Sequence, residues 1–580
     1  MSVPGMRRRA AVGLAALAAT AFTTVALQPE QATADPKPVD VKLLAINDFH
    51  GNLEPPTGSS ATIDGQTAGG AEYLATQLAK LRGKTKKEQD HTVTVAAGDL
   101  IGASPLLSAA FHDEPTIEAM NLAGLDFTSV GNHEFDEGAT ELLRMQNGGC
   151  HPVDGCADGT PFKGAKFQYL SANAFKTETG QPLLPPYGIK KIEGTSIGFI
   201  GMTLEGTPQI VSQQGVAGLS FADEAETANR YARILRAQGV EAIVVLVHEG
   251  GAQNGGGIND CTGFSGPIVD IANRMDPSID VIVSGHTHQA YNCNINGKLV
   301  TSASSFGRLV TDIDLKIDRR SGDVISARAN NVVVTRDVTP DRPTSDLITH
   351  YKTALGPVAD RVVGETTGAI TRTQENLYQT GVDANGKPTY QTGESALGNL
   401  IADAQLAATD DEQNAVAAFM NPGGVRADLG AGPVTYSDAF TVQPFANNLV
   451  TLDLTGAQLY CMLEQQFTAA RVLYASSTVH YVVDTNGTTA PVGAPCSGTR
   501  VVRGSLTIGG APVTDTATYR VTVNNFLSGG GDGFSVLVDG TNQVTGMIDL
   551  DAFVAYLTEK SPVSPPTLDR IQTTAEVSAA

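Results

Sequence analysis

The sequence predicts an α/β protein in which helices and sheets form layers, divided into two domains. The chain has 580 residues, which is too long for one compact core. From Asp40 to about Asp337, short apolar runs rich in β-branched residues alternate with helical stretches such as Glu224–Gln238. The composition then changes, and a second mixture of helices and strands runs from about Glu365 to Leu557. These observations predict two α/β domains, one after the other.

The first 34 residues have the pattern of a secretion signal. Three arginines at positions 7–9 precede an apolar run from Ala10 to Leu27, and small residues at Ala32–Ala34 suit cleavage before Asp35. A membrane anchor is the alternative, but the run is short and contains three threonines. The arginines fit part of a twin-arginine pattern, so Sec and twin-arginine export both stay open. We expect a secreted chain without stable membrane insertion, free outside the cell or associated with the cell wall.

A linker helix is expected between the two domains. After Asp337 the sequence has prolines, then a helical pattern with Ser345 at the N-cap position, and then Pro357. We place this helix at residues 341–364. The domains then occupy residues 35–340 and 365–560, and residues 561–580 form a C-terminal tail.

Six cysteines in an exported chain predict disulfides, because the compartment outside the cytoplasm is oxidising. Proximity in the sequence favours Cys150–Cys156, and Cys261–Cys293 and Cys461–Cys496 would complete the set. A cysteine metal site is the alternative, but no CxxC spacing supports it.

The charge of the chain argues against one class of partner. It has 39 Lys and Arg against 61 Asp and Glu, a formal net charge of −22. Such a surface repels nucleic acid, so we expect no non-specific binding of DNA or RNA. It also repels phosphate, so a phosphate site needs strong local positive charge.

Five apolar runs of the first domain each end in residues that can bind a metal ion. These residues are Asp48, His50, Asp99, Asn132, His133, His248, His286 and His288. In a layered α/β domain, ligands collect beyond the carboxyl ends of strands, so five such ends can surround one site. A single exposed histidine is more often a surface residue, and Asp48 or Asn132 alone could be turn chemistry. Five of the ten histidines lie at these ends, however, which argues against coincidence.

The types of residue at the ends of these five runs indicate which cofactor they could bind. Imidazoles and carboxylates without thiolates suit divalent ions such as Zn, Mn, Fe, Co or Ni. All of these residues except His133 are candidate metal ligands. Seven ligands are too many for one tetrahedral ion. They fit two ions about 3.5–4 Å apart that share Asp99 as a bridging ligand. His286 and His288 stand two apart in a segment expected to be extended, so both side chains would project to the same side.

The blocks "NDFHG", "GD", "GNHEFD", "HEGG" and "GHTH" resemble the signatures of the calcineurin-like metallophosphoesterases, and the whole chain resembles the secreted bacterial 5′-nucleotidases. The resemblance implies a four-layer sandwich flanked by helices for the first domain and a nucleotide-binding α/β domain for the second. It implies one ion on Asp48, His50, Asp99 and His288. It implies the other ion on Asp99, Asn132, His248 and His286.

His133 and Asp136 are expected to act in catalysis. A carboxylate three residues on fixes the imidazole tautomer and favours the protonated ring, which can stabilise the transition state or donate to the leaving oxygen. The resemblance implies such a pair in this block. In the alternative, Asp136 caps a helix and His133 is a third imidazole ligand.

The second domain supplies candidate substrate residues in "FMNPGGVRADL", "QPFANNLV" and "VNNFLSGGGDGFSVL". By resemblance, Phe445 and Phe526 sandwich a nucleobase, and Asp532 binds the ribose. Asn421, Gly424 and Arg426 contact the other polar or anionic groups of the ligand. A phenylalanine near a glycine run is otherwise usually a core residue. The chain departs from the family at Gln391, where relatives carry arginine; Arg372 could replace it only if the insertion at 373–394 folds back.

The sequence thus predicts a secreted dinuclear-metal phosphohydrolase of nucleotide catabolism. It would release phosphate from nucleoside 5′-monophosphates by attack of a metal-activated hydroxide. A UDP-sugar hydrolase or 2′,3′-cyclic nucleotide phosphodiesterase on the same site is the alternative. A non-catalytic nucleotide-binding surface protein is a more remote one, because it would lack metal ligands and none is missing here.

Overall fold

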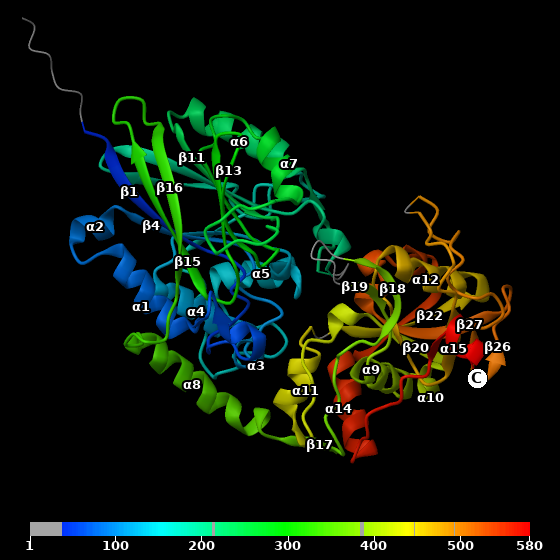
Figure 1. Cartoon of the computed structure of the whole chain (residues 1–580). Coiled ribbons are helices and arrows are strands. Elements are labelled where there is room, and N and C mark those ends of the chain that lie inside the picture. Colours follow the sequence, from blue (N-terminus) through cyan, green and yellow to red (C-terminus); the bar gives the residue numbers. More distant parts are fainter. Residues whose placement is uncertain (1–36, 212–214, 383–387, 446, 492, 580) are drawn as a thin grey trace, which may run out of the picture. The chain divides into compact units, whose positions relative to one another are not determined.

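The computed structural model describes residues 37–211, 215–382, 388–445, 447–491 and 493–579 (Figure 1). The predicted secretion signal, residues 1–34, lies outside the described residues. Within the described part of the chain, no helix combines the length and apolar character needed to cross a bilayer.

Two six-stranded mixed sheets organise the first region. The first sheet runs in the order β16 (Val324–Val333), β15 (Leu309–Ile317), β1 (Val39–Ile46), β4 (Thr92–Ala97), β5 (Phe127–Ser129) and β6 (Gln168–Leu170). In it, β1, β4, β5 and β6 are parallel, β15 is antiparallel to β1, and β16 is antiparallel to β15. The second runs in the order β13 (Ala290–Ile295), β14 (Lys298–Ala303), β12 (Val281–Ser284), β11 (Ala242–His248), β9 (Thr195–Thr203) and β8 (Tyr187–Ile192). Here β9, β11, β12 and β14 are parallel, with β8 and β13 antiparallel at the edges.

The sheets face each other, and each is covered on its outer face by helices (Figure 1). Side chains such as Leu43, Val95 and Val244 fill the space between the sheets. The first sheet's outer face packs on α1 (Ala71–Arg82), α4 (Glu114–Ala123) and α5 (Ala139–Asn147), and the second sheet's on α6 (Glu224–Ala237) and α7 (Pro267–Arg274). Since β11 is buried on both faces, its run is apolar throughout instead of alternating. The predicted four-layer α/β architecture is confirmed.

The helix expected between the two regions is α8 (Arg342–Ala359). Its N-cap is Asp341, whose carboxylate accepts the Thr344 N–H at 3.1 Å, so the expectation of Ser345 as N-cap is wrong. The reason is that Pro343 fits the first helical turn, where its missing N–H costs nothing. The helix therefore begins earlier, and the Ser345 hydroxyl donates to Glu72 instead.

A five-stranded sheet organises the second region, with α12 (Gly456–Thr468) on one face and α9 (Ala396–Ala407) and α14 (Asp549–Lys560) on the other. Phe419 packs on the α12 side and Met420 on the α9 side, as the pleat of β20 requires. The strands run in the order β23 (Tyr474–Ala475), β20 (Ala417–Met420), β27 (Thr518–Asn524), β22 (Asn448–Thr455) and β28 (Thr541–Ile548). A four-stranded sheet has the order β26 (Ala511–Pro512), β25 (Thr507–Ile508), β24 (Val479–Val483) and β29 (Ile571–Thr573). The exact domain limits at 340 and 365 stay predictions.

All six cysteines form disulfides: Cys150–Cys156, which sequence proximity favours, and Cys261–Cys293 and Cys461–Cys496, which complete the set. The insertion at 373–394 contains a hairpin of β18 (Asn376–Val382) and β19 (Pro388–Thr392).

Candidate metal centre and substrate pocket

The predicted metal ligands follow strands that end at a common edge of each sheet. β1, β4 and β5 are parallel neighbours, as are β11 and β12. The loops beyond them are joined by hydrogen bonds: the His50 N–H donates to the Asp99 carbonyl at 3.0 Å, and the His286 N–H donates to Asp48 Oδ1 at 3.0 Å. The structure thus brings the loops of the two sheets together, and all seven predicted ligands with them.

Glycines next to the ligands allow this close approach. A Cβ at Gly285 would lie 2.7 Å from the Ala97 carbonyl oxygen and 3.0 Å from Asp48 Oδ2. At Gly131 it would lie 2.0 Å from Asp99 Oδ1. A larger residue at either position would therefore displace a predicted ligand.

Five predicted ligands have left-handed backbone conformations, with φ of 51° at Asp48, 47° at His50, 48° at Asp99, 70° at His286 and 55° at His288. Such conformations cost on the order of 1–3 kcal/mol each and cluster at functional sites. They also correct one expectation. The "GHTH" segment is not extended, and its two histidines reach different partners: His286 Nδ1 lies 3.0 Å from Asn132 Oδ1, while His288 Nε2 lies 3.1 Å from His50 Nε2.

The donor atoms form two adjoining groups that share Asp99. In the first, His288 Nε2 lies 3.4 Å from Asp48 Oδ1, and His50 Nε2 lies 3.6 Å from Asp99 Oδ2. In the second, His248 Nε2 lies 2.9 Å from the same Asp99 oxygen, and His286 is held beside Asn132. Asp99 thus lies between the groups, where the predicted bridging ligand would stand.

The hydrogen bonds of the histidines show that the cluster fits divalent cations. His50 Nδ1 lies 2.9 Å from the Gly102 carbonyl oxygen, and His248 Nδ1 lies 2.7 Å from that of Ala97. Since a carbonyl only accepts, each Nδ1 carries the proton when the ring is neutral, and each Nε2 lone pair faces the carboxylates. Asp48 and Asp99 are 0% and 1% exposed. A buried set of acceptors with tautomers fixed from behind is the arrangement that metal-binding histidines adopt.

Burial and the neighbouring charges together set the charge of these groups. Burial lowers the pKa of His50 to about 3 and that of His286 to about 4, which keeps both rings in the neutral form that binds metals. At His248, burial acts the same way, but Asp99 outweighs it and raises the pKa to about 10. Burial also acts to raise the pKa of Asp48 and Asp99, but the neighbouring histidines outweigh it and lower both values. The carboxylates are therefore ionised.

His133 lies in the short 3₁₀ helix η2 (His133–Phe135) after β5, and its Nδ1 is 2.7 Å from Asp136 Oδ2. Its backbone N–H donates to Asp99 Oδ1 at 3.0 Å. This bond links His133 and Asp136 to the loops that carry the seven predicted metal ligands, which we call the metal side. Burial acts to lower the pKa of His133, but Asp136 and Asp99 together raise it to about 9. The ring also lies close enough to His50 and Asp99 to share a cation with them, so its role as a third imidazole ligand stays an alternative.

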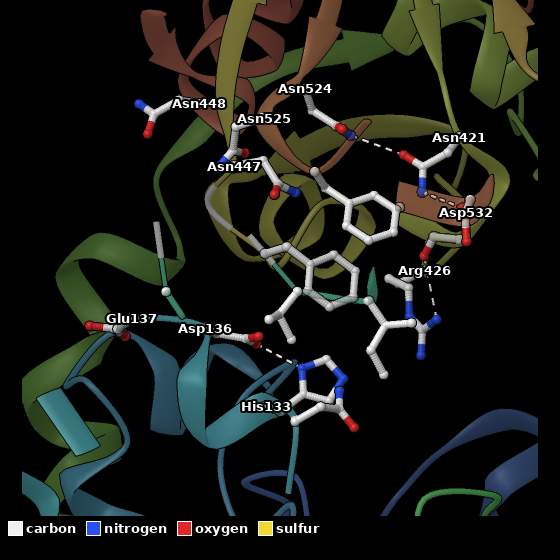
Figure 2. Close-up of a pocket in the computed structure, with 18 of the residues that line it drawn as sticks. His133, Asp136, Glu137, Asn421, Arg426, Asn447, Asn448, Asn524, Asn525 and Asp532 are labelled. Atoms are coloured by element: carbon white, nitrogen blue, oxygen red, sulfur yellow. Dashed lines mark hydrogen bonds and ion pairs between the residues drawn. The ribbon is translucent and has the colours of Figure 1, made fainter. Parts of the chain in front are cut away.

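A cavity of about 710 Å³ connects the metal side to the second region (Figure 2). Asn132, His133, Asp136 and His286 line one side of it. All six predicted substrate residues line the other: Asn421, Gly424, Arg426, Phe445, Phe526 and Asp532. The His133 and Phe445 rings are nearly parallel, with planes 14° apart and centroids 6.0 Å apart. The predicted catalytic pair and substrate residues therefore share one space.

The second side of the cavity is an edge of the five-stranded sheet. Asn421 follows β20, and Asn524 ends β27, the strand parallel to it. Asn524 Nδ2 donates to Asn421 Oδ1 at 2.9 Å, and Asn421 Nδ2 donates to Asp532 Oδ2 at 3.1 Å (Figure 2). The Phe526 ring packs so closely on Gly531 that a Cβ there would lie 2.6 Å from it. This chain of amides holds Asp532 in the cavity wall that Phe445 and Phe526 also line.

Comparison with known proteins gives two family matches. Residues 41–290 match the calcineurin-like phosphoesterases, and residues 363–539 match the 5′-nucleotidase C-terminal domain. The cell wall protein Lmo0130 of Listeria monocytogenes is 31% identical over 555 residues, covering 91% of this chain and 68% of that protein. The chain belongs to the calcineurin-like phosphoesterases that carry a 5′-nucleotidase C-terminal domain.

Two further relatives have this organisation over most of the chain. Endonuclease YhcR of Bacillus subtilis is 35% identical over 534 residues, which is 90% of this chain but only 40% of that protein. The chain thus spans about two fifths of its length. The crystal structure of a 5′-nucleotidase precursor from Thermus thermophilus superposes with a TM-score of 0.68 at 26% identity, covering 92% of this chain and 99% of that one. At the level of the family, the prediction of a metal-dependent phosphoester hydrolase is confirmed. The family implies divalent metal ions as cofactors, and the His and Asp clusters are compatible with them.

Sequence reasoning missed several residues of the candidate site. Glu134, within "GNHEFD", accepts the backbone N–H groups of Asp99 at 2.9 Å, Leu100 at 2.8 Å and Gly131 at 2.5 Å, and so anchors the Asp99 loop. Arg471 forms an ion pair with Asp532 in the cavity, although nothing in its sequence context marks it. Asn524 could have been found from its place in the "VNNF" block.

The departure at Gln391 also has a structural account. Its side chain is buried and donates to the Thr392 carbonyl at 3.1 Å, away from the cavity lining. Arg372 Nη1 donates to the backbone carbonyl of Arg426 at 2.8 Å, so it lies next to a cavity residue. Neither side chain lines the cavity itself.

Proposed function

We propose that this chain is a secreted 5′-nucleotidase that uses two divalent metal ions to release phosphate from nucleoside 5′-monophosphates. The observation that carries the proposal is the single cavity lined by His133 and Asp136 on one side and by Phe445, Phe526 and Asp532 on the other. A phosphate at the first side and a base at the second would be joined by one ribose. The structural similarity to the 5′-nucleotidase precursor from Thermus thermophilus supports the same function.

In this proposal Asp48, His50, Asp99 and His288 hold one ion, and Asp99, Asn132, His248 and His286 hold the other. When bound, such ions supply a hydroxide nucleophile near neutral pH and counter the charge of the phosphate. Asp99 Oδ2 faces both groups, and the Nδ1 hydrogen bonds of His50 and His248 leave Nε2 as the nitrogen available to an ion. The positive charge of the two ions would offset the repulsion between phosphate and a chain of net charge −22.

His133 acts on the phosphate ester in this proposal. Asp136 holds the ring through Nδ1 at 2.7 Å, which leaves Nε2 as the nitrogen available to substrate. A proton held at Nε2 can be donated to the leaving 5′-oxygen, and the cationic ring stabilises the charge that develops. Asp136 orients the ring.

Phe445 and Phe526 bind the base by stacking, and Asp532 accepts hydrogen bonds from the ribose hydroxyls. Arg426, whose guanidinium carbon lies 5.6 Å from the Phe445 ring centroid, supplies positive charge at the cavity wall together with Arg471. Asn421 and Gly424 also line the cavity and contact other polar groups of the ligand in this proposal.

The proposed location is outside the cell, either free or at the cell wall. The arginine-led apolar segment at the N-terminus supports export, and the Listeria relative is named a cell wall protein.

A second candidate is hydrolysis of UDP-sugars or 2′,3′-cyclic nucleotides on the same site. The cavity has a volume of about 710 Å³, and neither Gln391 nor Arg372 lines it, so no side chain at position 372 or 391 limits the size of the ligand. Separation of the products formed from AMP, UMP, UDP-glucose, 2′,3′-cyclic AMP and p-nitrophenyl phosphate distinguishes these functions when each is measured after chelation and after addition of Zn²⁺ or Mn²⁺. A monoesterase releases phosphate from AMP and UMP, whereas the second candidate first cuts UDP-glucose to UMP and glucose 1-phosphate and the cyclic nucleotide to an acyclic monophosphate.

The proposal predicts preference for AMP or UMP, activity that disappears on chelation and returns with metal, and slow hydrolysis of p-nitrophenyl phosphate. Activity that survives complete chelation would contradict the metal mechanism. Equal kcat/KM for AMP and p-nitrophenyl phosphate would contradict the base-binding role of the phenylalanines.

A further inference from the structure

Asp113 is a buried carboxylate that belongs neither to the predicted metal ligands nor to the His133–Asp136 pair. It stands at the N-cap position of α4, where an aspartate side chain usually accepts a backbone N–H of the first helical turn. Here the side chain makes no cap hydrogen bond. The residue is only 6% exposed, and its backbone is left-handed, with φ of 59°. A buried carboxylate that does not cap its own helix indicates a different role.

The Asp113 carboxylate instead binds two groups of the segment that follows Asp99. Its Oδ2 accepts the backbone N–H of Gly102 at 3.1 Å, and its Oδ1 accepts the hydroxyl of Ser108 at 2.6 Å. Burial raises the pKa of this carboxyl, while both hydrogen bonds act against the rise. Asp113 thus holds the backbone of this segment at Gly102.

Gly102 joins Asp113 to the candidate site. Its carbonyl oxygen lies 2.9 Å from His50 Nδ1, which leaves His50 Nε2 as the nitrogen available to an ion. A Cβ at Gly102 would lie 2.6 Å from the Cβ of His133 and 2.9 Å from Asp136 Oδ2. One residue therefore contacts a predicted metal ligand and also packs directly behind the proposed catalytic pair.

We propose that Asp113 is a positioning residue: it holds Gly102 where that residue orients His50 and supports the His133–Asp136 pair. Asp113 lies outside the cavity lining, so it acts through Gly102 and not on the substrate. Its effect on catalysis rests on the proposed function, whereas its effect on His50 does not depend on which ester is cut.

His112 fixes the same turn from its other side. Its Nδ1 lies 2.9 Å from Glu137 Oε2, and its Nε2 lies 3.0 Å from Asp154 Oδ2. Since carboxylates only accept, the ring donates to both as the imidazolium. Burial acts to lower the pKa of His112, but Glu137 and the neighbouring carboxylates outweigh it and raise the pKa. Glu137 directly follows Asp136, and Asp154 lies in the loop that the Cys150–Cys156 disulfide closes.

The test compares Asp113→Gly with Asp113→Asn, because glycine and asparagine both adopt a left-handed backbone readily. Glycine removes both side-chain hydrogen bonds, whereas asparagine keeps an oxygen that can accept one of them. We expect Asp113→Gly to bind Zn²⁺ about 10–100-fold more weakly than the wild type, measured by competition with a chromogenic chelator. At saturating Zn²⁺, kcat for AMP should also fall by about 10–100-fold while KM stays unchanged, because no substrate contact is removed. Asp113→Asn should lie between Asp113→Gly and the wild type.

The matched control is Asp64→Gly. Asp64 is an exposed aspartate with a left-handed backbone, φ of 48°, in the turn between β2 (Thr62–Ile63) and β3 (Gln66–Thr67). This variant should keep the zinc affinity and kcat of the wild type. Circular dichroism melting confirms that all of the proteins fold.

Equal zinc affinities of Asp113→Gly and Asp64→Gly would overturn the proposal. So would a crystal structure of Asp113→Gly in which Gly102 keeps its contacts with His50 and His133. A rise in KM without loss of zinc affinity would mean that Asp113 supports the substrate wall, which also contradicts it. If the wild type does not hydrolyse AMP, the proposed function is wrong, while the zinc affinity of Asp113→Gly still decides this inference.

Discussion

The two sides of the cavity are built in different ways. On the metal side, five of the seven predicted ligands are buried and His286 and His288 are half-buried. Five of the seven hold left-handed backbones, and glycines allow the loops to pack without space for a Cβ. On the substrate side, Phe526 and Arg471 are partly or well exposed, and the residues come from strand ends and loops linked by side-chain amides. Tightly packed ligands suit fixed metal coordination, whereas an exposed wall suits exchange of different nucleotides.

This difference predicts that substitutions on the metal side abolish the reaction, whereas those on the substrate side change which ester is cut. Asp99→Ala should have the largest effect, because Asp99 lies between both ligand groups. We expect loss of bound metal and a fall in kcat/KM for AMP beyond about 10³-fold, more than the loss of a single transition-state hydrogen bond causes. Metal analysis and phosphate release measure both. A variant that keeps two ions and most of its activity would refute the bridging role.

His133→Asn should slow catalysis without removing metal. Loss of general acid catalysis lowers kcat by about 10²–10⁴-fold, with metal content equal to that of the wild type. Asp136→Asn should lower kcat less, because it removes the orientation of the ring and not the ring itself. If His133→Asn instead loses metal as Asp99→Ala does, His133 is a ligand and its catalytic role is wrong.

Gly131→Ala should lower metal affinity, because the new Cβ would lie 2.0 Å from Asp99 Oδ1 and push that carboxylate away. The matched control is Gly356→Ala in α8, where a Cβ meets no atom within 4 Å. Zinc titration followed by activity should show that Gly131→Ala binds zinc about 10–100-fold more weakly than the control, the range for disturbed metal surroundings. Equal zinc affinities in the two variants would show that the Asp99 loop moves to make room for the new Cβ.

Phe526→Ala should change substrate choice. Stacking contributes about 1–3 kcal/mol per base, which corresponds to a rise in KM for AMP of roughly 5–150-fold. Hydrolysis of p-nitrophenyl phosphate should stay within about twofold of the wild type, because it needs only the metal side. An equal loss of activity on AMP and on p-nitrophenyl phosphate would mean that the Phe526 ring supports the fold and does not bind the base.

Arg471→Gln should have the smallest effect. Its guanidinium pairs with Asp532 but is half exposed, with 53% of the side chain accessible, so the pair contributes at most about 1 kcal/mol. We expect a change in KM for AMP of no more than about fivefold, with kcat unchanged. A larger effect confined to kcat would place Arg471 at the phosphate and not beside the ribose.

The metal side could be predicted from sequence because each ligand directly follows an apolar run, and parallel strands deliver such positions to one edge. The same reasoning failed where local pattern and backbone disagree: His286 and His288 are left-handed and not extended, and Pro343 moves the helix start from Ser345 to Asp341. Arg471 could not be predicted, because only the folded chain brings Asp532 to it.

The most direct test of the account is anomalous diffraction from crystals grown with Zn²⁺ and a non-hydrolysable analogue of a nucleoside 5′-monophosphate. The account predicts two peaks about 3.5–4 Å apart, one on each side of Asp99, with the base of the analogue between Phe445 and Phe526. A single peak at Asp99, or a base bound away from these two rings, would contradict it.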